Sequence, residues 1–331
     1  MRGAPPRAVP LPPDPGHKSG APPYEPAAMS VEISVIVPHL NQPELLRRLL
    51  ASLFAQGLDR GRAEVIVVDN GSRALPRAEV AAFPGVRLVE EPVPGPGPAR
   101  NRGAALARGP LLAFTDSDCT AAPGWLEAIL ARFAADPDLA VLGGDIRMTV
   151  ESPGDPSPAE AFECVYAYDQ RDYIERLGFS VTANLAMRQT AFAAVGPFGG
   201  IDVAEDTDWC ARARAQGLQV RYAPEMLVFH PARRSMAELR AKWDRIIGHR
   251  YAARRPGAAG AARWALTALA TALSVPAELP RILSTDRLDS PRARARALRG
   301  LAAIRLHRAR RMLAVLVSPA ARGGNLQWNR D

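Results

Sequence analysis

Short apolar runs alternate with amphipathic stretches between residues 31 and 232. The runs are rich in Val, Ile and Leu and are closed by proline, glycine or aspartate, which is typical of buried strands. Strands are predicted at residues 33–38, 65–68, 86–89, 111–114, 140–144, 220–222 and 227–229. Helices are predicted at residues 43–56, 99–107, 125–135 and 205–216, with a short strand and a helix within 181–198. This alternation indicates an α/β fold, a mostly parallel sheet flanked by helices.

Two flanking regions lack this alternation. Residues 1–28 contain nine prolines and almost no apolar periodicity, which predicts a disordered Pro-rich tail. Met29 directly precedes the first strand, so it is a candidate start of translation, with a genuine flexible tail as the alternative. Residues 233–331 are rich in arginine and are predicted to form a basic helical extension.

Charge is distributed unevenly along the chain. Residues 1–230 carry 21 basic and 28 acidic side chains, whereas residues 231–331 carry 21 basic and 6 acidic ones. The basic part therefore suits a polyanionic surface without identifying it. The three cysteines, at positions 119, 164 and 210, have neither CxxC nor metal-ligand spacing, so we expect no disulfide framework and no zinc site.

The basic extension leaves two interpretations open. Its segments 240–255, 264–277 and 292–317 could form amphipathic helices on an anionic membrane surface, or a solvated helical cap. No apolar stretch reaches the roughly 18 to 20 residues of a spanning helix, and the first residues show no secretory signal. We therefore expect a cytoplasmic protein, with peripheral attachment to the inner face of the cytoplasmic membrane as the alternative.

Polar residues follow the strands at the edge where an α/β sheet binds its ligand. The most informative of these is the triplet Asp116-Ser117-Asp118, directly after the apolar run 111–114. Carboxylate oxygens suit a hard divalent cation such as Mg²⁺ or Mn²⁺, which in turn holds phosphate oxygens. Taken alone, such a triplet is more typical of a solvated or helix-capping turn, so its surroundings must decide.

The segment Gly95-Pro96-Gly97-Pro98-Ala99-Arg100 resembles a dinucleotide-binding loop only superficially. Arg100 occupies the place of the third glycine, and the loop does not follow the first strand, which disfavours a nicotinamide or flavin enzyme. Arg100 and Asn101 instead open a helix that can face anionic oxygens. A solvated basic helix is the alternative.

Together these residues resemble the family 2 glycosyltransferases, which have a GT-A fold. The resemblance covers roughly residues 31–232 and rests on motifs in a fixed order: VIVPHLNQ (35–42), VDNGS (68–72), GPARNRG (97–103), FTDSDC (114–119), TANLAMR (182–188) and EDTDWCAR (205–212), followed by His230. It implies a Rossmann-like glycosyltransferase domain at residues 29–232. The nucleotide-sugar half would span about residues 29–120 and the acceptor half about 121–232.

The resemblance also assigns roles on the nucleotide side. It implies that the donor contacts residues of the first four motifs: Pro38, His39, Asn41, Asp69, Asn70, Ser72, Arg100, Asn101, Asp116 and Asp118. Asp116 would approach the ribose, and Asp118 would ligate a Mn²⁺ or Mg²⁺ ion, with His230 as its partner and Asp116 as a further candidate. Asn70 stands where many members carry a second aspartate, and His39 replaces a smaller residue, so the base remains open.

On the acceptor side the resemblance makes Asp206 the catalytic base, with Glu205 and Asp208 as rivals. Glu205 and Trp209 are acceptor candidates, although a tryptophan here is equally typical of a core. Tyr166, Tyr168 and Tyr173 are weaker candidates of the same kind. A base on one side and cationic charge on the leaving-group side suffice for inversion, without a second carboxylate as nucleophile.

The sequence therefore predicts a metal-dependent inverting glycosyltransferase. It would move a hexose or similar sugar from a nucleoside-diphosphate carrier to a hydroxyl of a cell-surface or lipid-linked glycan. The alternatives are a nucleotidyltransferase, which the motif at 205–212 disfavours, and a non-catalytic nucleic-acid-binding protein. Few stacking aromatics follow Trp264, so no nucleic-acid partner is expected.

Overall fold

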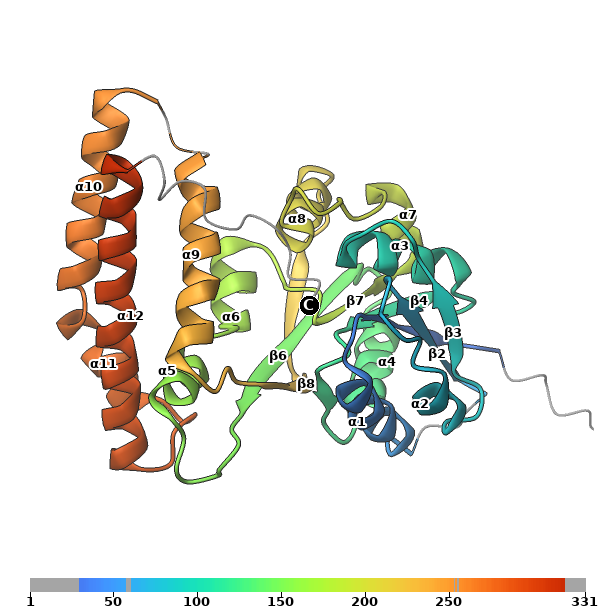
Figure 1. Ribbon diagram of the computed structural model, residues 1–331. Helices are drawn as coiled ribbons and strands as arrows, with labels where there is room; N and C mark the ends of the chain where they lie inside the picture. Colours follow the sequence, from blue (N-terminus) through green and yellow to red (C-terminus); the bar gives the residue numbers. More distant parts are fainter. Residues whose placement is uncertain (1–29, 58–60, 253, 255, 319–331) are drawn as a thin grey trace, which may run out of the picture.

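The computed structural model describes residues 30–57, 61–252, 254 and 256–318. The predicted disorder of residues 1–28 and the candidate start at Met29 fall outside these residues. In the described part, a sheet with flanking helices lies beside a separate group of long helices (Figure 1). The predicted α/β fold with a C-terminal helical extension is confirmed.

A single sheet of eight strands forms the centre, in the order β3-β2-β1-β4-β7-β6-β8-β5. Strands β3, β2, β1 and β4 are parallel, β7 runs antiparallel to both β4 and β6, and β6 is parallel to β8. The strands are β1 Ile33–His39, β2 Ala63–Asp69, β3 Arg87–Glu90, β4 Leu111–Thr115, β5 Thr120–Ala121, β6 Val141–Thr149, β7 Asn184–Arg188 and β8 Val220–Pro231.

Helices cover both faces of the sheet because side chains alternate along each strand. Val35 and Val37 pack in the core that contains Leu46 of α1 and Trp125 of α4, whereas Ile36 packs with Trp209 of α8 on the other face. The helices of this part are α1 Pro43–Phe54, α2 Arg77–Ala81, α3 Pro96–Leu106, α4 Trp125–Ala135, α5 Pro158–Tyr166, α6 Gln170–Asp172, the π-helix η1 Tyr173–Leu177, α7 Gln189–Val195 and α8 Glu205–Ala215.

Helix α3 begins three residues earlier than the sequence predicts. The Gly-Pro loop is itself the first turn, because Pro96 stands at a position where its fixed φ and missing N–H are compatible with a helix. Gly97 is required there, since a Cβ atom would lie 2.0 Å from the carbonyl oxygen of Gly199. The prolines that suggested a loop therefore start the helix.

Strand β8 is one continuous strand where two were predicted around Pro224. The register with β6 jumps from Ala223, opposite Gly144, to Leu227, opposite Asp145. Pro224 therefore lies in a bulge, where its missing N–H breaks no ladder hydrogen bond.

The basic extension is helical, as predicted. Its elements are α9 Met236–Ala252, α10 Ala258–Leu273, the 3-10 turn η2 Pro276–Glu278, α11 Leu279–Ser284 and α12 Pro291–Val317. The apolar segment 264–277 is not one helix, because α10 ends at Leu273 and Pro276 starts the next turn. No helix of the described residues passes a length and hydropathy test for a bilayer span by itself. Residues 258–273 and 276–284 pass it only as a pair bent by 57°.

The extension shares a hydrophobic core with the sheet-bearing part. Phe162 of α5 packs with Leu239 of α9 and Leu301 of α12. Gly300 lets α12 approach closely, since a Cβ atom there would lie 2.2 Å from the carbonyl oxygen of Pro158. The predicted boundary near residue 232 therefore separates an acidic from a basic part of the sequence. The hydrophobic core, however, contains residues from both sides of this boundary.

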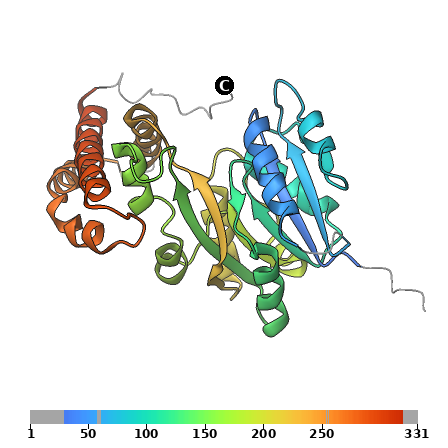
Figure 2. The same ribbon diagram turned by 90° about the horizontal axis from the view of Figure 1, so that it is seen from below.

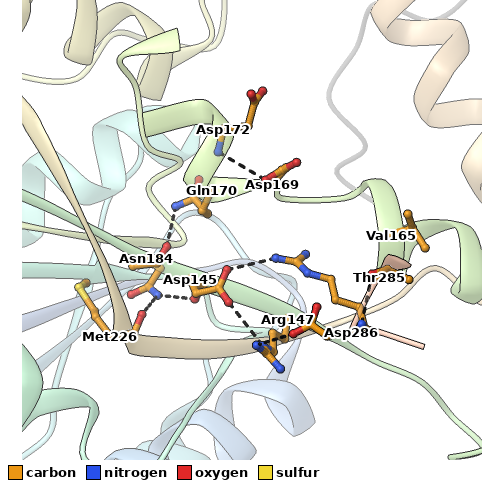
Figure 3. Close-up of polar contacts among 12 residues, drawn as sticks. Asp145, Arg147, Val165, Asp169, Gln170, Asp172, Asn184, Met226, Thr285 and Asp286 are labelled. Carbon is orange, nitrogen blue, oxygen red and sulfur yellow. Dashed lines mark hydrogen bonds and ion pairs between the residues drawn. The ribbon is translucent and has the colours of Figure 1, made fainter. Parts of the chain in front are cut away.

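Polar contacts around Asp145 tie the same two parts together (Figure 3). The buried carboxylate of Asp145 on β6 accepts from Arg287 Nη2 at 3.2 Å and from Arg147 Nε at 3.4 Å. Arg147 in turn contacts Asp286 at 3.4 Å. The segment before α12 is thereby fixed against the central sheet.

Asn184 is the polar centre of this region, and its side chain is fully buried. Its Nδ2 donates to the carbonyls of Asp145 at 2.8 Å and Met226 at 2.7 Å, and its Oδ1 accepts from Trp125 Nε1 at 2.9 Å. One amide thus connects β7 with β6, β8 and α4.

Replacing Asn184 by alanine should lower the free energy of unfolding by at least about 2 kcal/mol, because the buried Trp125 indole loses its acceptor. Urea unfolding followed by circular dichroism measures this. The control Thr190→Ala, at an exposed position on α7, should change it by less than about 0.5 kcal/mol. Equal stability of the two variants would contradict the structural role of Asn184.

Candidate active site

A cavity of about 550 Å³ lies at the carboxyl ends of β1, β2 and β4, the edge where the sequence predicts ligand binding. Residues far apart in the chain come together here. The predicted site residues that line it are Pro38, His39, Asn41, Asn70, Arg100, Asp116, Asp118, Glu205, Asp206 and His230.

Asp69 holds the wall of the cavity at the end of β2. Its carboxylate accepts from His39 Nδ1 at 2.9 Å and from the backbone N–H of Ser72 at 2.9 Å. Burial alone would raise the pKa of Asp69, but hydrogen bonds from Ser72 and His39 hold this pKa below its ordinary value. His39 Nε2 accepts from the Gln42 N–H at 3.2 Å, so the hydrogen bonds fix the imidazole with its proton on Nδ1.

Asn70 fixes the loop that leads into α3. Its Nδ2 donates to the carbonyls of Glu91 at 2.9 Å and Val93 at 2.7 Å, and its Oδ1 accepts from the Gly95 N–H at 2.7 Å. An aspartate has no N–H groups to donate to these carbonyls. The departure from the family pattern noted in the sequence therefore has a structural reason.

Three predicted donor contacts, Asp69, Ser72 and Asn101, lie outside the cavity lining. Ser72 Oγ accepts from the Asn41 N–H at 2.9 Å, and Asn101 forms two hydrogen bonds with the backbone of Phe198. Each of these side chains is hydrogen-bonded to protein groups and supports the cavity wall. Their roles as donor contacts stay predictions.

Arg100 joins two acidic segments of the site. Its guanidinium, which is 2% exposed, lies 2.6 Å from Asp116 Oδ1 and 2.8 Å from Glu205 Oε1. Burial would lower the pKa of Arg100, but the two carboxylates raise it. The sequence predicts that Arg100 faces anionic oxygens. In the structure these are the carboxylate oxygens of Asp116 and Glu205.

Asp206 differs from its two rivals. It lines the cavity, and its half-burial together with the charge of Glu205 raises its pKa above the ordinary value. Glu205 is neutralised by Arg100, and Asp208 is paired with Arg212 at 3.0 Å and does not line the cavity. Asp206 is therefore the carboxylate best suited to accept a proton.

Asp118 and His230 lie next to each other in the cavity lining. His230 Nδ1 lies 2.8 Å from the carbonyl oxygen of Pro231, so Nδ1 carries the proton and Nε2 presents a lone pair in the neutral ring. That Nε2 lies 3.3 Å from Asp118 Oδ2 and 3.4 Å from the Tyr168 hydroxyl. Burial and the charge of Asp116 raise the pKa of Asp118, while His230 opposes this shift.

Asp118 and His230 are the residues of the cavity that could hold a metal ion. An imidazole lone pair and a carboxylate oxygen at 3.3 Å are two acceptors that need a cation or a proton between them. Among the residues that the structure describes, no group of three His, Cys, Asp or Glu side chains encloses such a cation. A metal here would therefore take further ligands from outside the protein, as Mg²⁺ commonly does.

Trp209 is a core residue, which is one of the two interpretations that the sequence left open. Its side chain is fully buried, its Nε1 donates to the Gly196 carbonyl at 2.9 Å, and its ring packs with Phe192 and Phe198. The ring cannot reach an acceptor from this position.

The cavity lining also contains residues outside the main predicted set, among them Tyr168, Arg233 and Arg245. Tyr168, only a weak candidate in the sequence, packs its ring on His230 at 5.0 Å, while Arg233 and Arg245 come from the basic extension. Arg233 is paired with Glu163 at 2.7 Å. Arg245 is half-buried on α9. Because the surrounding sequence contains many arginines, nothing in it singles out Arg245 as a cavity residue.

Replacing Asn70 by aspartate should lower the free energy of unfolding by about 2 kcal/mol, because two carbonyls then face a carboxylate. Urea unfolding measures this loss, and hydrogen exchange should show faster exchange of the Gly95 N–H. The control Gln219→Glu, which makes the same chemical change on an exposed side chain, should leave both unchanged. A variant with wild-type stability and exchange would contradict the loop-holding role.

Comparison with known proteins agrees with the geometry. The family described as "Glycosyl transferase family 2" matches residues 34–196. Glycosyltransferase AglE of Haloferax volcanii is 30% identical over 220 residues, which cover 65% of this chain and 71% of that protein. The pre-mycofactocin glycosyltransferase of Mycobacterium tuberculosis is 32% identical over 215 residues, covering 62% of this chain and 44% of that protein.

The fold is shared with a solved glycosyltransferase. The mannosyltransferase PcManGT of Pyrobaculum calidifontis, solved with GDP-mannose and Mn²⁺, superposes with a TM-score of 0.54 at 18% identity, covering 91% of this chain and 88% of that one. These matches confirm the resemblance found in the sequence. The chain belongs to glycosyltransferase family 2 and is a nucleotide-sugar-dependent glycosyltransferase with the GT-A fold.

Proposed function

We propose that the chain transfers a sugar, with inversion, from a nucleoside-diphosphate sugar to a hydroxyl group of a glycan or lipid-linked acceptor, with the help of a divalent cation. One observation carries this proposal. A single cavity is lined both by the Asp118–His230 pair, which suits a metal, and by Asp206, which suits a base. Inverting transfer needs these two functions on opposite sides of the reacting carbon.

On the donor side, Asp118 and His230 would hold Mn²⁺ or Mg²⁺. When bound, the cation would neutralise the diphosphate of the donor and of the departing nucleotide. PcManGT, which has the same fold, was solved with GDP-mannose and Mn²⁺, and this supports a donor of that class. Asp116 shares its charge with Arg100 at 2.6 Å, which favours the ribose contact over metal binding for this residue.

On the acceptor side, Asp206 would take the proton of the attacking hydroxyl. Its raised pKa brings it closer to neutral pH, where a carboxylate is a more effective general base. The proton moves to Asp206 as the acceptor oxygen bonds to the anomeric carbon and the nucleoside diphosphate leaves from the other face. No covalent sugar–enzyme bond is required, so one base carboxylate suffices.

Arg245 would add positive charge on the side of the diphosphate. It is the cavity arginine for which the described residues provide no ion pair, whereas Arg100 and Arg233 are both paired with carboxylates. Guanidinium groups bind phosphate oxygens through two N–H donors at once. The basic extension would therefore contribute directly to donor binding.

The reaction is tested with a panel of nucleotide sugars and Mn²⁺ or Mg²⁺, by donor binding and by transfer or hydrolysis. Asp206→Asn should retain donor binding but lose about 10²- to 10⁴-fold in turnover, as expected for removal of a general base. Asp118→Ala should lose metal-dependent donor binding. The control Asp208→Asn, in the same helical turn but outside the cavity, should stay near wild type.

Two results would contradict these assignments. Full transfer by Asp206→Asn would exclude this residue as the base. Donor binding that is unaffected by chelation of divalent cations would exclude the metal role of Asp118 and His230.

The charge on α9 gives a separate prediction. Arg245→Ala should weaken the binding of the nucleoside diphosphate by about 1.5–3 kcal/mol, the usual contribution of a hydrogen bond to a charged group. Calorimetric titration with UDP and GDP measures this loss. Arg240→Ala, on an exposed part of the same helix, is the matched control and should bind normally. Equal affinities for both variants would remove Arg245 from the donor site.

A further inference from the structure

Helices α10, α11 and α12 lie on the side of the molecule farthest from the sheet (Figures 1 and 2). We propose that their outer surface docks on an anionic phospholipid membrane. This proposal goes beyond the transfer reaction and does not depend on it.

The outer surface of α10 is an apolar stripe. Leu266, Leu269 and Leu273 are spaced by three and four residues, so they share one face of the helix, and they are 66%, 56% and 69% exposed. On the next helix, Leu279 and Leu283 are also exposed. Exposed patches of large aliphatic side chains on one helix face are typical of interaction surfaces.

The opposite face of α10 already has a partner. Ala268 and Thr271 are buried, and Trp264 Nε1 donates to the Met312 carbonyl of α12 at 2.8 Å. Trp264 also packs on Tyr251 of α9 at 5.4 Å, so this face of α10 is covered by α12 and α9. The three leucines of the stripe take no part in that packing, so they are available to a further partner.

Arginine and apolar side chains share the exposed stripe of α12. Positions separated by three or four residues are exposed along the whole helix, and they include both kinds of side chain. The large residues of this stripe are Arg292, Arg299, Leu306, Arg310, Leu313 and Val317. A helix that lies on a membrane typically carries both kinds of side chain. Its leucines enter the boundary between headgroups and acyl chains, and its arginines contact lipid phosphates.

Charge complementarity selects an anionic bilayer as the partner. Residues 231–331 carry 21 basic and 6 acidic side chains, whereas the preceding residues are net acidic. Arg299 and Arg310 are exposed and form no ion pair with the described residues, so they remain available to lipid phosphates. Anionic lipids would attract the basic extension and repel the acidic sheet-bearing part, so the extension would face the membrane.

The geometry favours lying on the membrane over crossing it. Residues 258–273 and 276–284 meet at 57°, and at their junction Glu278 pairs with Arg305 of α12 at 2.6 Å. A pair that crossed the bilayer would have to leave α12 and bring this carboxylate into hydrocarbon. Surface docking leaves both contacts intact.

Flotation of the full chain with vesicles tests the proposal. The protein should float with vesicles of phosphatidylcholine mixed with phosphatidylglycerol and much less with phosphatidylcholine alone. An alkaline carbonate wash should release it. No flotation with the anionic vesicles would overturn the proposal, and retention after the wash would replace it with a spanning arrangement.

Two sets of variants locate the surface. Leu266→Gln, Leu269→Gln and Leu273→Gln together should abolish flotation, while Leu177→Gln, an exposed leucine elsewhere, should not affect it. Arg299→Glu with Arg310→Glu should weaken vesicle binding by more than about tenfold, since each basic residue near the surface contributes about 1 kcal/mol. The control Arg47→Glu with Arg48→Glu changes the net charge equally on exposed positions of α1.

The controls distinguish a defined surface from diffuse attraction or another partner. An equal loss in both charge-reversal variants, or normal flotation of the leucine variant, would overturn the proposed surface. A wild-type dimer in light scattering that becomes monomeric in the leucine variant, without vesicle binding, would assign the stripe to a second copy of the chain instead.

Discussion

The buried guanidinium of Arg100 is the interaction on which the site depends. Four carboxylates, those of Asp116, Asp118, Glu205 and Asp206, line one cavity, and their mutual repulsion would drive the ends of β4 and α8 apart. Arg100 bonds to one carboxylate from each segment, at 2.6 Å and 2.8 Å. Because it is almost fully buried, these two ion pairs are little screened by water. Arg100 therefore joins the end of β4 to the start of α8 through one side chain.

This pairing also divides the carboxylates by role. Asp116 and Glu205 are ion-paired with Arg100, and Asp118 lies beside His230. Asp206 forms no ion pair with the described residues, and its Oδ1 accepts from the Thr207 N–H at 2.6 Å. Burial and the charge of Glu205 raise the pKa of Asp206, although Thr207 and Arg100 oppose this shift. Neighbouring carboxylates of one motif thus differ in their electrostatic surroundings.

Much of the fold and of the site could be predicted from local patterns. The strands, the flanking helices and the gathering of Asp116, Asp118, Asp206 and His230 follow from apolar periodicity and from ordered motifs. Local patterns do not specify the distant contacts that surround a residue. Trp209 belongs to the core, and Asn101 holds the backbone of Phe198. Arg245 enters the cavity from a helix whose sequence is uniformly rich in arginine.

The sequence by itself determined the class of fold and the family, because strand periodicity and motif order are properties of consecutive residues. It also determined that the last hundred residues are basic and that helices follow residue 235, as the described residues of this part show. Only the tertiary structure decided which charges neutralise one another, which aromatic ring is buried and which leucines of the extension remain exposed. These outcomes depend on groups far apart in the sequence, such as Arg100 and Glu205, which are 105 residues apart, and Asp145 and Arg287, which are 142 apart. Electrostatic and packing energies follow distance in space, which the order of residues does not specify.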